Sequence, residues 1–108
     1  MQKPLVIEDG EFRWQVSLTN DLDPGTYGTT ENPTHDKNGL ISIDADLPRF
    51  RFLHTALHEL LHAAEFAEDC PIEDKVIDKA ARYLARVFDQ NPQLVKFLFD
   101  KGGKRADR

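Results

Sequence analysis

Cysteine is almost absent from this sequence, which holds only Cys70. A single cysteine cannot form an intrachain disulfide, and a zinc site built from several cysteines is excluded for the same reason. Such sparse cysteine usage is compatible with a reducing compartment. Residues 1–8 also lack the apolar stretch of a secretory signal. We therefore expect a cytoplasmic protein.

Long apolar runs and an excess of positive charge are missing as well. No run approaches the roughly 18–20 apolar residues that a membrane-spanning helix requires. The 14 Lys and Arg residues are outnumbered by 19 Asp and Glu residues, which gives a net charge of -5. Nucleic-acid-binding domains usually present a basic face to the phosphates. We expect neither a membrane nor a nucleic acid as partner.

The size of the chain fits one domain with one modest core, since it has 108 residues of which 40% are hydrophobic. The domain is expected to span residues 1–103, and the charged residues 104–108 are expected to form a disordered tail.

The first half of the sequence has the pattern of short strands. Residues 12–18 and 40–44 alternate apolar and polar side chains, as half-buried strands do, and Trp14 is expected in the core. Asn38-Gly39 predicts a tight turn before the second strand. The intervening residues 20–39 are rich in Thr, Asn, Asp, Gly and Pro, which indicates a long loop with a short strand around residues 27–30.

The second half has the pattern of helices. From Pro48 an apolar stripe recurs at helical spacing through Leu53, Leu57, Leu60, Ala64 and Ala67. Asp46 is the expected N-cap, and Cys70-Pro71 should end this helix. A second helix is predicted from about residue 72 to 90, and a third over residues 94–99, closed by Gly102-Gly103.

These elements predict an α+β domain. A small antiparallel or mixed sheet from the N-terminal half packs against two or three helices.

The first predicted helix carries the motif His58-Glu59-Leu60-Leu61-His62. Residues four apart on a helix lie on the same side, one turn along the axis, so the two imidazoles point the same way. Two neutral imidazoles can bind one Zn²⁺. Glu59 lies about 100° around the helix from His58, where a carboxylate could take a proton from water activated by the ion and deliver it to a leaving amine.

A catalytic zinc usually has a third protein ligand, and the second helix offers three candidates. Glu73 ranks first, because it shares a helical face with residues expected to face the core, where an acid needs a partner. Asp74 ranks second and Asp78 third, and one of these two could instead accept the free N–H of a zinc-bound histidine. His54 is set aside as a ligand, since three histidines at positions 54, 58 and 62 span about 12 Å along the helix.

The motif, preceded by the strand Gly-Leu-Ile-Ser-Ile-Asp of residues 39–44, resembles the core of the zincin metallopeptidases. The segments 73–77 and 89–92 resemble small metallopeptidases encoded by phages and prophages. There is a more distant similarity to gluzincins, whose third ligand is a glutamate on the next helix.

This resemblance implies a peptidase with one Zn²⁺ per chain held by His58, His62 and Glu73, and with Glu59 as general base. Its substrate would be a peptide or protein. The substrate could add as a strand beside residues 39–44, and the compartment would be the cytoplasm of a bacterial host cell. The alternative is a non-catalytic zinc-binding or interaction protein of the same origin.

Overall fold

The chain folds into four strands followed by three helices in the computed structural model, which describes residues 5–102. The elements are β1 (Leu5–Asp9), β2 (Phe12–Thr19), β3 (Gly28–Glu31), β4 (Asn38–Asp44), α1 (Arg49–Ala67), α2 (Asp74–Gln90) and α3 (Pro92–Gly102). The predicted α+β class is therefore confirmed. Gly103 and the predicted tail 104–108 lie outside the described residues.

The sheet is mixed and has the strand order β1-β2-β4-β3. β1 and β2 form an antiparallel hairpin whose turn contains Gly10 at a φ of 57°. β2 and β4 run parallel, whereas β3 pairs antiparallel with β4 and forms one edge of the sheet. The short strand expected around residues 27–30 is thus β3.

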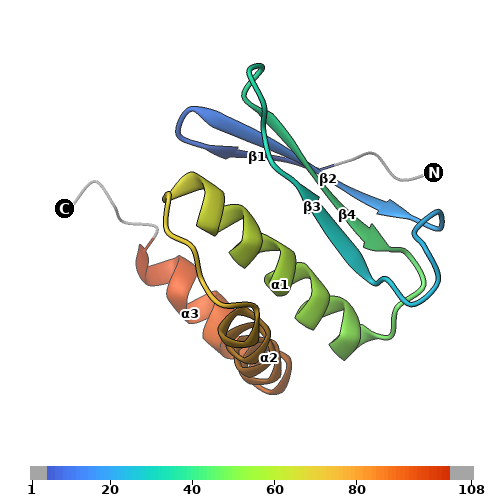
Figure 1. Cartoon of the computed structure of the whole chain (residues 1–108). Helices are drawn as coiled ribbons and strands as arrows, with labels where there is room; N and C mark the ends of the chain where they lie inside the picture. The colour runs from blue at the N-terminus through green and yellow to red at the C-terminus, as the bar shows by residue number, and fades with distance from the viewer. Residues whose placement is uncertain (1–4, 103–108) are drawn as a thin grey trace.

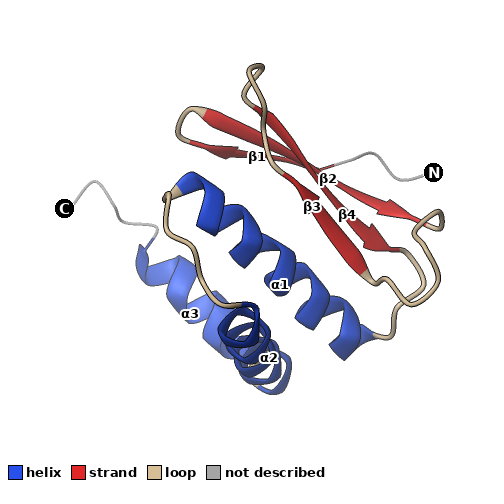
Figure 2. Cartoon of the chain, viewed as in Figure 1, coloured by secondary structure: helices blue, strands red, loops and turns tan. Residues whose placement is uncertain are grey.

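Three layers follow one another in the molecule: the sheet, then α1, then α2 with α3 (Figures 1 and 2). Trp14, Ile41 and Ile43 of the sheet pack with Ala63 of α1 in the buried core. Trp14 is 2% exposed, which confirms its predicted place. On its other side α1 meets α2, whose buried residues are Ile77, Ala81 and Ala85.

Packing on two sides changes which positions of α1 are buried. Its buried residues are His54, Thr55, Glu59 and Ala63, while Leu60 of the predicted apolar stripe is 40% exposed. A helix that touches a sheet on one side and a helix on the other has no single buried stripe. Three of its four buried residues are polar, and each needs a partner.

Two sequence predictions about β4 are wrong. Asn38 and Gly39 do not form the turn but begin the strand. Position 39 requires glycine for another reason: it lies opposite Trp14, and a Cβ there would approach the Trp14 ring to 2.6 Å. β4 is also paired on both sides, with β2 and β3. A peptide therefore cannot add beside residues 39–44, and the free edge on this side of the sheet is β3.

The ends of α1 also differ from the prediction. Asp46 is not the N-cap: its N–H donates to the carboxylate of Asp44, the last residue of β4, and Pro48 takes the N-cap position. The helix ends at Ala67, before Cys70-Pro71. Asp69 adopts a φ of 51°, and its N–H and that of Cys70 donate to carbonyls of the last turn, as in a Schellman motif.

Within residues 5–102, no helix combines the length and apolar character needed to cross a membrane.

Candidate metal centre

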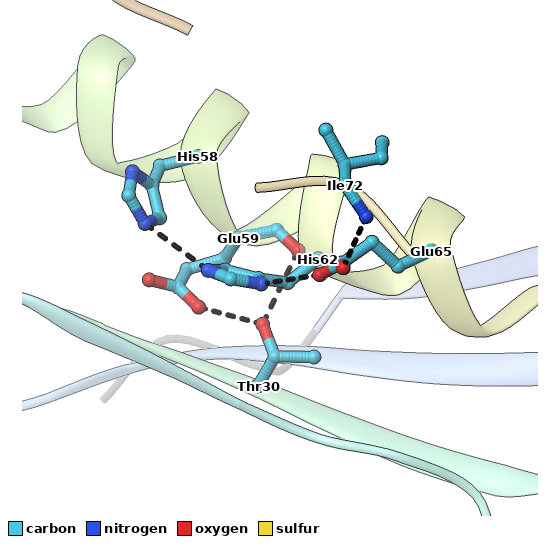
Figure 3. A network of polar contacts seen from close by, with 6 residues as sticks. All are labelled: Thr30, His58, Glu59, His62, Glu65 and Ile72. Carbon is cyan, nitrogen blue, oxygen red and sulfur yellow. Dashed lines mark hydrogen bonds and ion pairs between the residues drawn. The ribbon is translucent and has the colours of Figure 1, made fainter. Parts of the chain in front are cut away.

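His58 and His62 turn their imidazole rings toward each other from successive turns of α1. Their Nε2 atoms lie 3.2 Å apart, as Figure 3 shows. Both side chains are partly open to solvent, with 26% and 28% of their surface exposed. The spacing argument, which predicts both rings on one side of the helix, is confirmed by this geometry.

Each of these rings also meets a carboxylate at its other nitrogen. Nδ1 of His62 lies 2.9 Å from Oε1 of Glu65, and Nδ1 of His58 lies 3.4 Å from Oδ1 of Asp78. The backbone N–H of Ile72 donates to Glu65 at 2.8 Å. That hydrogen bond, followed by the one from His62, lowers the pKa of the Glu65 carboxyl, so this carboxylate is ionised at neutral pH and accepts a hydrogen bond from the ring N–H.

What the histidine pair can bind depends on which ring nitrogens carry the protons. A neutral imidazole has one N–H and one lone pair. With Nδ1–H in both rings, two Nε2 lone pairs face each other at 3.2 Å, an arrangement that a cation between them would stabilise. With one Nε2–H, the same distance is a hydrogen bond between the two rings. Two nitrogens bound at about 2.0–2.1 Å to one tetrahedral Zn²⁺ lie roughly 3.3–3.4 Å apart. The 3.2 Å separation of the two Nε2 atoms is close to this range.

A second group shares His58. His54, His58 and Asp78 each offer one ligand atom, and these three atoms all lie within 4.8 Å of one another, so the three residues form a group that could hold a metal ion. His54 is 9% exposed, and its Nε2 lies 3.0 Å from Asp78. The sequence argument set His54 aside because it considered α1 alone. The structure adds Asp78, which reaches both rings from α2.

Glu59 occupies the buried side of α1, next to the histidine pair. It is 6% exposed, and its Oε1 accepts a hydrogen bond from Oγ1 of Thr30 at 2.6 Å. In Figure 3 its carboxylate lies between His58 and the Thr30 hydroxyl. Thr30 belongs to the edge strand β3.

The two histidines and Glu59 line one side of an open cleft of about 570 Å³, and β3 residues 28–30 line the other. An adjoining cavity of about 260 Å³ shares Gly28, His58 and Glu59 with this cleft. The histidine pair and the acid between them in the motif are therefore accessible from a space that also borders the sheet edge.

The three acids proposed from the second helix have different positions. Glu73 is exposed and is the N-cap of α2, so the expectation that it faces the core is wrong. Its role as third ligand stays a prediction, as does the set His58, His62 and Glu73. Asp74 is also exposed. Asp78 is the acid that contacts a motif histidine, as expected for one of the two aspartates.

Sequence reasoning did not identify Thr30 or the contact between Glu65 and His62. Thr30 lies 29 positions from Glu59, so no local pattern could reveal the pairing. The Glu65 contact is local, since positions 62 and 65 are neighbours on a helix surface, and this spacing could have indicated it.

No protein-family model, no curated protein and no solved structure shows a significant match to this chain. The fold and the site define an α+β protein with a histidine and carboxylate group on α1 and α2 that could hold a metal ion.

Proposed function

We propose that this protein is a zinc-dependent peptidase, in which His58 and His62 hold the ion and Glu59 is the general base. One observation carries the proposal: two Nε2 atoms lie 3.2 Å apart while both rings meet a carboxylate at Nδ1. Carboxylate partners of this kind fix the tautomer and the orientation of metal-binding histidines. The motif supplies a buried acid beside the pair, as peptide hydrolysis requires.

The chain's own residues have distinct roles in this proposal. A bound zinc ion would polarise the scissile carbonyl and increase the acidity of water. Glu59 would take a proton from the attacking water at a carboxylate oxygen and later transfer it to the leaving amine. Its low exposure of 6% would keep bulk water away from the carboxylate during these transfers.

Glu73 is the third ligand in this proposal, with Asp74 and Asp78 as alternatives. The support is a chain of contacts: His62 meets Glu65, and Glu65 accepts the N–H of Ile72. The next residue is Glu73, at the N-cap of α2. The start of α2 is therefore tied to the histidine pair, and an exposed glutamate there has the freedom to turn toward an ion.

The proposed substrate is a peptide that adds to the edge strand β3. This strand has one hydrogen-bonded neighbour in the sheet, β4, and its residues 28–30 line the cleft beside His58 and Glu59. An extended peptide can pair with such an edge through its backbone, which would place a peptide bond near the histidine pair.

A second candidate is a metal-binding protein without catalytic activity. It is favoured by the group of His54, His58 and Asp78, in which Nε2 of His54 and the Asp78 carboxylate lie 3.0 Å apart across the two helices. In that case the ion would join α1 to α2, and Glu59 would have no role in chemistry.

The test combines native mass spectrometry with hydrolysis of a quenched fluorescent peptide library. We expect one Zn²⁺ per wild-type chain and measurable cleavage. Glu59→Gln should keep the zinc and lose about 10²–10⁴-fold in rate, the usual contribution of a general base. Glu8→Gln removes an exposed acid from β1 and is the matched control. Zinc binding without any cleavage would support the second candidate, and full activity in Glu59→Gln would show that the base is wrong.

A further inference from the structure

Two residues of β3 contact the Glu59 side chain from the same side of the strand. Residues two apart on a strand point to the same face, so Gly28 and Thr30 both face α1. The Thr30 hydroxyl lies 2.6 Å from Oε1 of Glu59 and 3.2 Å from the Glu59 carbonyl oxygen. In Figure 3 a dashed line joins this hydroxyl to the carboxylate.

Gly28 provides the space in which the Glu59 side chain lies. A Cβ at position 28 would approach Cγ2 of Thr55 to 2.7 Å, Cγ of Glu59 to 3.0 Å and Oε2 of Glu59 to 3.2 Å. The glycine is therefore required by the close approach of β3 to α1. Any larger side chain there would displace Thr55 or the carboxylate.

We propose that Gly28 and Thr30 are positioning residues for Glu59: they hold its carboxylate in one orientation toward the cleft. The hydroxyl of Thr30 donates to Oε1, while Oε2 is the oxygen that comes nearest to Gly28. One oxygen is thus fixed by a hydrogen bond, and the other stays available for proton transfer. The catalytic meaning of this arrangement rests on the proposed function, but the orientation of the carboxylate does not.

A general base on a helix needs a contact from another element to hold its carboxylate in one position. A glutamate has three side-chain torsions, and proton transfer requires the acid to be placed well within about 1 Å of its productive position. The helix backbone fixes only the first atom of the side chain. Thr30, from another element, fixes the last, and it does so on the strand that borders the cleft.

The first experiment uses variants that change the hydroxyl alone. Thr30→Val keeps the volume and removes the donor, whereas Thr30→Ser keeps the donor. We expect Thr30→Val to lower kcat about 10–100-fold with little change in KM and in zinc affinity, and Thr30→Ser to restore most of kcat. Thr19→Val, the same substitution on β2, is the control for loss of a strand hydroxyl, since the Thr19 hydroxyl accepts the nearby N–H of Asp21.

The second experiment measures the carboxylate without reference to activity. In protein labelled with ¹³C at glutamate carboxyls, the Glu59 resonance is assigned from its loss in Glu59→Gln. We expect this resonance to move in Thr30→Val and in Gly28→Ala, and to stay near the wild-type position in Thr30→Ser and Thr19→Val. An unmoved resonance in Thr30→Val would overturn the positioning role. If the resonance moves but the wild-type protein cleaves no peptide, the proposed function fails and the positioning stands.

Discussion

Most of the buried residues of α1 are polar, and their partners in other elements bear directly on the candidate site. A buried polar group without a partner costs about 1–3 kcal/mol, so a helix selected only for packing would avoid it. His54 and Glu59 are both buried, and their partners come from other elements, Asp78 of α2 and Thr30 of β3. This concentration of satisfied polar groups in one segment agrees with the candidate metal-binding group on α1 and α2.

The carboxylate at each Nδ1 should contribute to metal affinity. Glu65→Gln removes the charge that orients His62, and we expect zinc affinity to fall about 10–100-fold, the usual effect of losing such a partner. Competition with a fluorescent chelator measures this change. Glu68→Gln removes an exposed acid at the C-cap of the same helix and should have little effect. Equal losses in the two variants would indicate a general effect of charge, not a specific contact with His62.

The site was predictable from sequence only as far as local spacing extends. The separation of His58 and His62 determines that their rings share a side of the helix, and the structure agrees. The contacts of Asp78 and Thr30 depend on how α2 and β3 pack against α1, over separations of 24 and 29 residues. Helical periodicity carries no information about such pairs. For the same reason the pattern predicts Glu73 on the core-facing side of α2, although the buried residues of that helix begin at Ile77.

At the scale of elements, β4 shows how packing overrides a local signal. Asn-Gly is a strong turn signal, yet Gly39 lies inside the strand opposite Trp14. A Cβ at this position would come within 2.6 Å of the ring, so glycine is needed for space. The strand β1 is not predicted from the sequence, because Leu5 and Val6 are exposed and Ile7 alone among its residues is partly buried. An edge strand of this kind shows little of the apolar and polar alternation that identifies a strand.

Gly39→Ala tests this account of β4. The added methyl group must displace the buried Trp14 ring, and overpacking of this kind costs about 1–3 kcal/mol. Urea unfolding followed by tryptophan fluorescence measures the loss, and we expect a lower midpoint with an unchanged slope. Ser42→Ala, on the same strand, is the control and should change stability by less than about 0.5 kcal/mol. Stability equal to wild type in Gly39→Ala would show that the ring has room to move.

At the scale of the whole molecule, the site lies where the three layers meet. α1 supplies the histidines and Glu59, β3 borders the cleft, and α2 supplies Asp78. Because α1 packs against the sheet on one side and against α2 on the other, its side chains at this location have little conformational freedom. The same location should link metal binding to folding, since the ligands come together only in the folded chain.

Zinc should therefore raise the stability of the whole domain. At a free zinc concentration 100 times Kd the stabilisation is about 2.7 kcal/mol, which is on the order of 10 °C in Tm for a domain of this size. Calorimetry with and without zinc measures the shift, and Mg²⁺ serves as the control ion. If the ion lies between the two Nε2 atoms, His62→Ala loses the shift and His54→Ala keeps most of it. If the ion is held by His54, His58 and Asp78, the two variants exchange their results, because His62 is then not a ligand. A wild-type Tm that zinc leaves unchanged would contradict both arrangements, since either would bind the folded chain in preference to the unfolded one.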